Sequence, residues 1–272
     1  MTDPATDTAP AIVRVHRGSA PLLVSLPHDG TFVPPAIAAR LTDAARRVPD
    51  TDWHVSRLYA FARELGASLI VPSHSRYVVD LNRSEDDVSL YPGQNTTGLC
   101  PVRRFDGGPV YVAGAEPDEA EVRARVDATW RPYHAALAAE LARIRELHGH
   151  VVLWEGHSIR GEAPWLFEGR LPDLNLGTAG GASCAPALQA RLEGVLAAQR
   201  DFDWVANGRF RGGHITRHYG RPGDGIDAVQ LEISQRIYMD EDSFAYLEPR
   251  AAVAQRTIRA LLEAALGRDA QR

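Results

Sequence analysis

Val151-Val152-Leu153-Trp154-Glu155-Gly156-His157-Ser158 is the stretch that decides the fold class of this 272-residue chain. Its first four residues are β-branched or large and apolar, which is typical of a buried strand. Charged and polar residues follow directly, so the strand should end in groups that can carry chemistry. Short β-rich runs beside polar residues also occur at 22–26, 68–71, 77–81 and 229–233. The pattern predicts a set of core strands with polar residues at their ends.

Segments with helical periodicity separate these strands, at 35–46, 53–65, 117–147, 185–199 and 249–266. Strands that alternate with helices predict an α/β fold with a central, mostly parallel (mixed) sheet flanked by helices. We predict a disordered tail at residues 1–10 and a single domain over residues 11–272. Active sites of such sheets lie at the carboxyl ends of the strands. Two long glycine- and proline-rich stretches, 84–116 and 161–183, should form walls of that site.

The composition excludes several kinds of chemistry. All 30 basic residues are arginine, so a Schiff-base lysine and the lysine of a Walker phosphate loop are both missing. The formal net charge of −5 argues against nonspecific nucleic-acid binding. Cys100 and Cys184 fit no disulfide framework or C-x-x-C motif, the start of the chain is unlike a signal peptide, and no apolar run reaches membrane-spanning length. These features predict a cytoplasmic protein; its oligomeric state stays open.

Two histidines follow predicted strands and are candidates for a metal site. His28 comes after the run 22–26, and His157 comes after 151–154. Either one, taken alone, could instead be an ordinary hydrogen-bonded loop histidine. A catalytic zinc needs a third ligand and an open position for water. Asp50 and Asp52 precede the predicted helix 53–65, so one should cap that helix and the other could bind the metal. We favour Asp52 as the ligand and Asp50 as the cap or as a residue that supports the ligands, and the reverse order stays open.

Glu232 is the candidate general base because it is the one charged residue in the predicted strand 229–233. A carboxylate in such a strand is costly unless it is paired or functional. A buried glutamate with a raised pKa beside a metal suits proton transfer during hydrolysis. The alternative is an exposed position on an edge strand. Glu155 is either a rival base or a partner that orients a histidine ligand.

Several arginines occur in settings that suit recognition of a carboxylate. Arg83 follows Asn82 at the end of the predicted strand 77–81, and Arg160 comes shortly after His157. Arg209 and Arg217 lie in or just after a glycine-flanked segment. Each arginine alone could serve an internal ion pair, but together they predict a small substrate with two carboxylates. The chain has no G-x-S-x-G elbow and no G-x-G-x-x-G after a strand, which argues against a serine hydrolase and a dinucleotide enzyme.

Several longer strings resemble the N-formylglutamate deformylase (N-formylglutamate amidohydrolase) family. They are LPHDG at 26–30, PDTDWH at 49–54, SRYVVDLNR at 75–83, LYPGQNTTGLCP at 90–101, NGRFRGG at 207–213, HITRHYGRP at 214–222 and QLE at 230–232. The resemblance runs from about the first strand to Glu241. It also implies a more distant relation to zinc carboxypeptidases and a phosphorylase/hydrolase-like fold.

The resemblance implies roles for individual positions. His28 and His157 would be zinc ligands, Asn82 and Arg83 would hold a substrate carboxylate, and Glu232 would be the general base. Two positions differ from the expected pattern. Thr31 stands where the carboxypeptidases have a glutamate ligand, so Asp52 is inferred rather than matched to a motif. Glu155 stands where the family usually has aspartate.

We therefore expect a zinc-dependent amidohydrolase, with another divalent metal as an alternative. Its expected reaction is hydrolysis of N-formyl-L-glutamate to formate and L-glutamate, the last step of one histidine-degradation route. Its expected partner is this small substrate, and neither a nucleic acid nor a membrane. Two alternatives stay open: an amidohydrolase for another N-acyl or N-formyl amino acid, and a metal-free sensor of acidic amino acids.

Overall fold

The computed structural model describes residues 9–89 and 93–267. Its seven strands are β1 (Val13–His16), β2 (Leu22–Ser25), β3 (Ser68–Pro72), β4 (Val151–Ile159), β5 (Leu174–Gly177), β6 (Trp204–Ala206) and β7 (Ile226–Ser234). They form one sheet in the order β1-β3-β2-β4-β7-β5-β6. β1 pairs with β3 and β5 pairs with β7 in antiparallel fashion, whereas the other four pairings are parallel. The predicted α/β fold with a mostly parallel, mixed sheet is confirmed.

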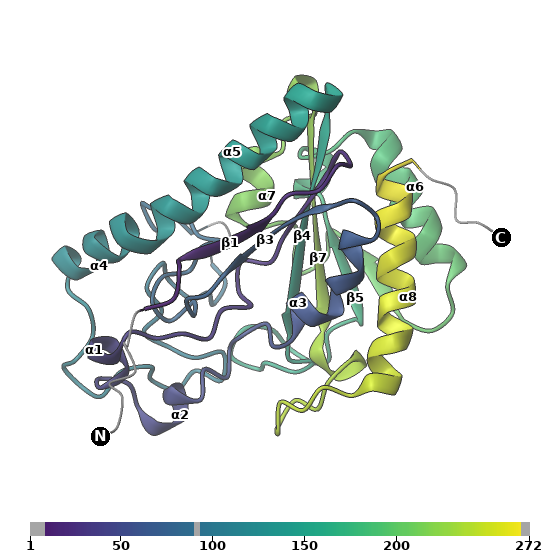
Figure 1. Cartoon of the computed structure of the whole chain (residues 1–272). Helices are drawn as coiled ribbons and strands as arrows, with labels where there is room; N and C mark the ends of the chain where they lie inside the picture. Colours follow the sequence, from purple (N-terminus) through teal and green to yellow (C-terminus); the bar gives the residue numbers. More distant parts are fainter. Residues whose placement is uncertain (1–8, 90–92, 268–272) are drawn as a thin grey trace, which may run out of the picture.

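Helices cover both faces of the sheet (Figure 1). The helices are α1 (Pro35–Ala38), α2 (Asp43–Arg46), α3 (Val55–Leu58), α4 (Glu119–Arg125), α5 (Arg131–His148), α6 (Pro186–Ala198), α7 (His214–Tyr219) and α8 (Glu248–Ala265). Apolar side chains of α3, α6 and α8 pack on one face of the sheet. Those of α5 and α7 pack on the other face. Each face is therefore buried, which explains why the central strands are apolar along most of their length.

The long helix predicted at 117–147 contains one irregular turn. α4 and α5 are joined by a π-helical turn, η2 (Val126–Trp130), so the helical run is continuous from Glu119 to His148. Asp118 caps its start by accepting a hydrogen bond from the Glu121 amide, and Gly149 ends it in the left-handed conformation that glycine adopts readily. The helices predicted at 185–199 and 249–266 are also confirmed, as α6 and α8.

Other predicted elements differ from the structure. The segment 35–46 forms two short helices, α1 and α2, and the segment 53–65 forms α3 followed by a 3-10 turn, η1 (Ala60–Arg63). The prediction of a strand at 77–81 was wrong, because this segment consists of turns and irregular backbone. Four elements of six residues or fewer were not predicted, namely β1, β5, β6 and α7. Such short elements show too few periods for a pattern to emerge.

Two further predictions concern the chain ends and membranes. Most of the predicted tail at 1–10 lies outside the described residues, as do residues 90–92 at the start of the LYPGQNTTGLCP string. No helix in the described part of the chain is long and apolar enough to cross a membrane.

Candidate active site

A cavity opens where β2, β4 and β7 end. The backbone turns away from the sheet after β2, which brings His28 to the cavity, while His157 and Glu232 lie near the carboxyl ends of β4 and β7. Residues from the long loops complete the wall, among them Thr96, Thr97, Phe105 and Leu166. The site therefore lies where an α/β sheet favours it, and both long loops contribute to it as predicted.

His28, Asp52 and His157 converge at one side of this cavity. Each of the three side chains is buried, and each offers one ligand atom within 4.8 Å of the other two. The Oδ2 atom of Asp52 lies 3.2 Å from Nδ1 of His157 and 3.8 Å from Nδ1 of His28. Two imidazole nitrogens and a carboxylate oxygen are ligands that zinc accepts, with room for a further ligand from the substrate side. The structure thus brings together the three residues predicted as metal ligands.

The environment of His28 fits a metal ligand. Its Nε2 atom bonds with Oδ1 of Asp80 at 2.7 Å, while Nδ1 is buried and has no hydrogen-bond partner. Burial and the neighbouring Arg76 lower the pKa of His28, so its imidazole is neutral near pH 7. A carboxylate on one ring nitrogen and a free lone pair on the other is the usual arrangement of a histidine that binds a metal.

Arg76 links the two carboxylates of this cluster, Asp52 and Asp80. Its guanidinium lies 3.0 Å from Asp52 and 3.7 Å from Asp80, and the arginine side chain is 8% exposed. Although burial alone would raise the pKa of Asp80, His28 and Arg76 hold it well below its ordinary value. Both carboxylates therefore stay charged. Neither Arg76 nor Asp80 was predicted as a site residue, although both lie in the SRYVVDLNR string.

His157 lies between carboxylates on both sides of its ring. Nδ1 faces Asp52, and Nε2 lies 3.7 Å from Oε1 of Glu155. Burial alone would lower the pKa of His157, but its hydrogen bond to Asp52 and the nearby Glu155 carboxylate outweigh this effect and raise the pKa to about 10. The cluster therefore favours positive charge at this position, either a proton or a divalent cation that displaces it.

Glu155 is a partner of His157 rather than a group that lines the cavity. It is fully buried, and its Oε2 atom accepts hydrogen bonds from the Thr216 amide at 3.1 Å and from the Thr216 hydroxyl at 2.6 Å. Its Oε1 atom is buried without a hydrogen-bond partner and faces His157. This geometry supports the prediction that Glu155 orients the His157 ring, and not the alternative that Glu155 is the general base.

Glu232 lies beside His157 because β4 and β7 pair in parallel with these two residues opposite each other. The side chain lines the cavity, and the residue is 7% exposed. Burial is the main reason why its pKa is raised to about 8, and the nearby Asp52 and Glu155 carboxylates add to the effect. A carboxylate with a raised pKa beside a candidate metal site is well suited to accept a proton.

Asp50 and Asp52 have separate roles, and neither caps α3. Asp50 accepts hydrogen bonds from the Tyr77 hydroxyl at 2.7 Å and the Phe105 amide at 3.0 Å. Asp29 instead bonds to the Ser56 amide in the first turn of α3, at 2.8 Å. The expectation that one aspartate of this pair caps the helix was wrong, because the chain supplies the cap from a different loop.

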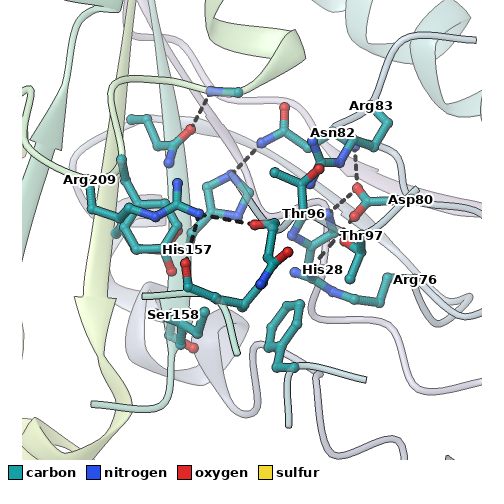
Figure 2. Close-up of a pocket in the computed structure, with 18 residues that line it drawn as sticks. His28, Arg76, Asp80, Asn82, Arg83, Thr96, Thr97, His157, Ser158 and Arg209 are labelled. Carbon is teal, nitrogen blue, oxygen red and sulfur yellow. Dashed lines mark hydrogen bonds and ion pairs between the residues drawn. The ribbon is translucent and has the colours of Figure 1, made fainter. Parts of the chain in front are cut away.

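The predicted substrate-binding residues divide into two groups. Asn82, Arg83 and Arg209 line the cavity, and Figure 2 shows Arg83 and Arg209 on opposite sides of it. Arg160 and Arg217 do not line it. Arg160 bonds to Asp242 at 2.8 Å and to the Glu241 carbonyl at 2.9 Å, and Nε of Arg217 donates to the Gly212 carbonyl. The structure therefore supports neither of these two as an anchor for substrate.

Asn82 lines the cavity, but its amide is bonded to the protein. Its Nδ2 atom lies 3.1 Å from Nε2 of His157, and its Oδ1 atom accepts a hydrogen bond from the Ile215 amide at 2.9 Å. These contacts connect a metal-ligand candidate to the first turn of α7. Asn82 thus positions its neighbours, in addition to the substrate contact that was predicted for it.

Comparison with known proteins gives a consistent result. A sequence model of the N-formylglutamate amidohydrolase family matches residues 20–239. The chain is 52% identical to the N-formylglutamate deformylase of Pseudomonas aeruginosa over 256 residues, which cover 94% of this chain and 96% of that protein. It is 48% identical to the N-formylglutamate deformylase of Pseudomonas putida over 262 residues, which cover 96% and 98% of the two chains.

Solved structures show the same relationship. The crystal structure of N-formylglutamate amidohydrolase from Ralstonia eutropha JMP134 superposes with a TM-score of 0.79 at 26% identity, over 94% of this chain and 96% of that one. A gene product from Agrobacterium tumefaciens shares the fold, with a TM-score of 0.68 at 20% identity over 94% and 95% of the two chains. Because the family match spans most of the chain and two relatives are about half identical to it, this chain belongs to the N-formylglutamate amidohydrolase family.

Proposed function

We propose that this protein hydrolyses N-formyl-L-glutamate to formate and L-glutamate, using a divalent metal, zinc in the first instance. The observation that carries the proposal is the buried cluster of His28, Asp52 and His157 beside Glu232, in a cavity that Arg83 and Arg209 also line. The printed names of the two Pseudomonas relatives support the same reaction.

The residues fit a metal in both charge and geometry. His28 offers an unpartnered buried nitrogen, and Asp52 supplies a negatively charged oxygen within reach of both imidazoles. A bound divalent cation would polarise the formyl carbonyl and lower the pKa of a water molecule. Asp80 and Glu155 would hold the two histidine rings in place, which commonly strengthens metal binding.

Glu232 would move the proton that this hydrolysis requires. Its ionised carboxylate takes a proton from the attacking water as the new C–O bond forms at the formyl carbon. It then passes the proton to the amine nitrogen as the C–N bond breaks, which yields formate and glutamate. A pKa raised to about 8 makes this carboxylate a stronger base than an exposed glutamate.

Arg83 and Arg209 would supply the two cationic anchors that a dicarboxylate needs. A guanidinium binds a carboxylate through paired hydrogen bonds, and a substrate that lacks a carboxylate forgoes these charge-assisted bonds. Both arginines are half-buried at the wall of the cavity. Arg209 is already held in place, because its guanidinium donates to the carbonyls of Asn95 and Leu166 at 3.3 Å. The cavity should therefore discriminate strongly against neutral formamides.

The proposal is tested by formate release with and without a chelator, together with metal analysis. The wild type should release formate from N-formyl-L-glutamate and lose activity when the metal is removed. Glu232→Gln should reduce turnover by about 10²–10⁴-fold while the metal content is unchanged. Glu162→Gln, an exposed glutamate of the 161–173 loop, is the matched control and should leave turnover unchanged. Near-normal turnover by Glu232→Gln would contradict the role of Glu232.

The same assay separates the two alternatives. Faster turnover of N-formylaspartate or N-acetylglutamate would indicate a different amidohydrolase substrate. Binding of glutamate without stoichiometric metal and without formate release would favour a metal-free sensor. The place in histidine degradation and the cytoplasmic location stay predictions.

A further inference from the structure

Gln230 is a buried polar residue of the cavity that the sequence analysis assigned no role. It lies on β7 two residues before Glu232, so both side chains are on the same face of the strand. It is 3% exposed and lines the cavity. The β4–β7 register places Gln230 opposite Glu155, one step from the pair formed by His157 and Glu232.

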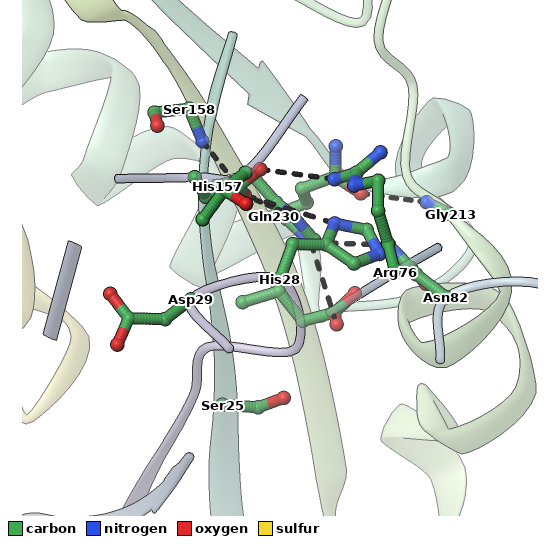
Figure 3. A network of polar contacts seen from close by, with 12 residues as sticks. Ser25, His28, Asp29, Arg76, Asn82, His157, Ser158, Gly213 and Gln230 are labelled. Atoms are coloured by element: carbon green, nitrogen blue, oxygen red, sulfur yellow. Dashed lines mark hydrogen bonds and ion pairs between the residues drawn. The ribbon is translucent and has the colours of Figure 1, made fainter. Parts of the chain in front are cut away.

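The orientation of the Gln230 amide is fixed by one hydrogen bond (Figure 3). Its Oε1 atom accepts from the Gly213 amide at 2.7 Å. Because a backbone N–H can only donate, the oxygen must be on this side, and the Nε2 group must be on the other. Within residues 9–89 and 93–267, no protein acceptor bonds to this Nε2. Because Gln230 lines the cavity, this N–H group can find an acceptor in a molecule bound there.

Gly213 is itself held firmly. It precedes α7, and a Cβ atom at this position would lie 2.3 Å from Nδ2 of Asn82. Only glycine lets the backbone pack so closely on Asn82, which in turn contacts His157. The backbone of Gln230 is held in β7, and its side-chain oxygen is bonded to the tightly packed Gly213. The Nε2 donor is therefore held in one orientation before a substrate binds.

We propose that Nε2 of Gln230 donates a hydrogen bond to a carboxylate of the substrate, next to the arginine that pairs with that carboxylate. This inference rests on the proposed function. A neutral donor suits this position because Glu232 and Glu155 are close, and the cavity already holds three arginines, Arg76, Arg83 and Arg209. A neutral amide adds direction to the binding of the carboxylate without adding another charge.

Gln230→Glu is the most informative variant. It keeps an oxygen for the Gly213 amide and replaces the Nε2 donor with a second oxygen, which repels a carboxylate. We expect KM for N-formyl-L-glutamate to rise by about 10–100-fold, with kcat changed much less. Gln255→Glu on α8 makes the same chemical change at a residue that contacts the Leu58 carbonyl and does not line the cavity, so it should leave KM unchanged.

Two substrate analogues identify the carboxylate. N-formyl-L-isoglutamine replaces the α-carboxylate with an amide, and N-formyl-L-glutamine replaces the γ-carboxylate. The ratio of variant to wild-type KM should fall toward one for the analogue that lacks the carboxylate facing residue 230. An equal ratio for all three substrates, or an unchanged KM for N-formyl-L-glutamate, would overturn the proposal.

A second variant covers the case in which Gln230→Glu does not fold. Gln230→Met has a similar size and removes the donor without adding charge, so KM should still rise by about 10-fold at normal metal content. An unchanged KM in this folded variant also overturns the proposal. If the wild type itself releases no formate, the proposed function fails; if only the Gln230 variants behave like wild type, this inference alone fails.

Discussion

The two halves of the active site are held in place by different means. The strand half consists of Glu155, His157, Gln230 and Glu232 on β4 and β7. The loop half consists of His28, Asp52, Arg76, Asp80, Asn82 and Arg83 on irregular segments. In the strand half, nine consecutive residue pairs of β4 and β7 fix the spacing of the side chains. The backbone pairing therefore sets the positions of these residues relative to one another.

The loop half depends on side chains of one helical run. Nη1 of Arg125 donates to the carbonyls of Tyr77 and Val78, and Nε2 of His134 contacts the carbonyl of Leu81 at 2.9 Å. The indole N–H of Trp130 donates to the carbonyl of Arg83, also at 2.9 Å.

These bonds satisfy backbone groups that a strand would have paired with its neighbours. Trp130 also ends the π-helical turn η2, an irregularity that occurs frequently near functional sites. A single side-chain replacement should therefore disturb the loop half more readily than the strand half.

His134 should give the largest effect, because it makes the loop half sensitive to acid. Burial is the main reason why its pKa is lowered to about 3, whereas an unfolded histidine has a pKa near 6.5. The unfolded state thus binds the extra proton first, and stability falls as the pH drops from 6.5 toward 3. The loss should reach roughly 4 kcal/mol, at up to about 1.4 kcal/mol per pH unit.

Urea unfolding between pH 7 and pH 4 measures this dependence. His134→Gln should reduce its slope, because glutamine does not titrate. His148→Gln, at the exposed end of the same helix, is the control and should keep the wild-type slope. An unchanged slope in His134→Gln would mean that the acid sensitivity resides elsewhere in the fold.

Asp80→Asn should produce the next largest effect, on metal binding. Asp80 is the one residue of the described chain that hydrogen-bonds the His28 ring, so its loss should lower metal affinity by about 10–100-fold. Glu155→Gln is the corresponding change in the strand half. It should cost less, because Asp52 and Asn82 also contact the His157 ring. Titration against a chromophoric chelator measures the metal affinity of the two variants. Equal losses of metal affinity would contradict the proposal that the loop half is more easily disturbed than the strand half.

The same difference explains what could be predicted from the sequence. Strands β2, β4 and β7 carry long apolar runs, and the polar residues at their ends were found together with them. His28, His157 and Glu232 could be singled out because each interrupts or directly follows such a run. The local sequence pattern is sufficient to predict a site residue where the hydrogen bonds between strands determine its position.

The loop half could not be predicted in this way. The run Tyr77-Val78-Val79-Asp80-Leu81 has the composition of a strand, yet its carbonyls bond to side chains that lie roughly 50 residues later. The arginines show the same limit. Arg160 follows a strand just as Arg83 follows a β-like run, but Arg160 bonds to Asp242, which is 82 residues away in sequence. Only the tertiary arrangement distinguishes a candidate substrate anchor from a structural ion pair.

Trp130→Phe should have the smallest effect. It tests most directly whether side chains of the helical run hold the loop half in place. It keeps an aromatic ring stacked on His134 and removes only the N–H that bonds to the Arg83 carbonyl. KM for N-formyl-L-glutamate should rise by about 3–10-fold, and stability should fall by about 1 kcal/mol. Tyr133→Phe removes one hydrogen bond to Ser25 from a residue slightly further along the same helical run, without touching the loop half. A similar loss of stability with an unchanged KM in Tyr133→Phe would assign the KM effect of Trp130→Phe to Arg83. An equal rise in KM in both variants would show that the helix as a whole, rather than its bond to Arg83, holds the loop half in place.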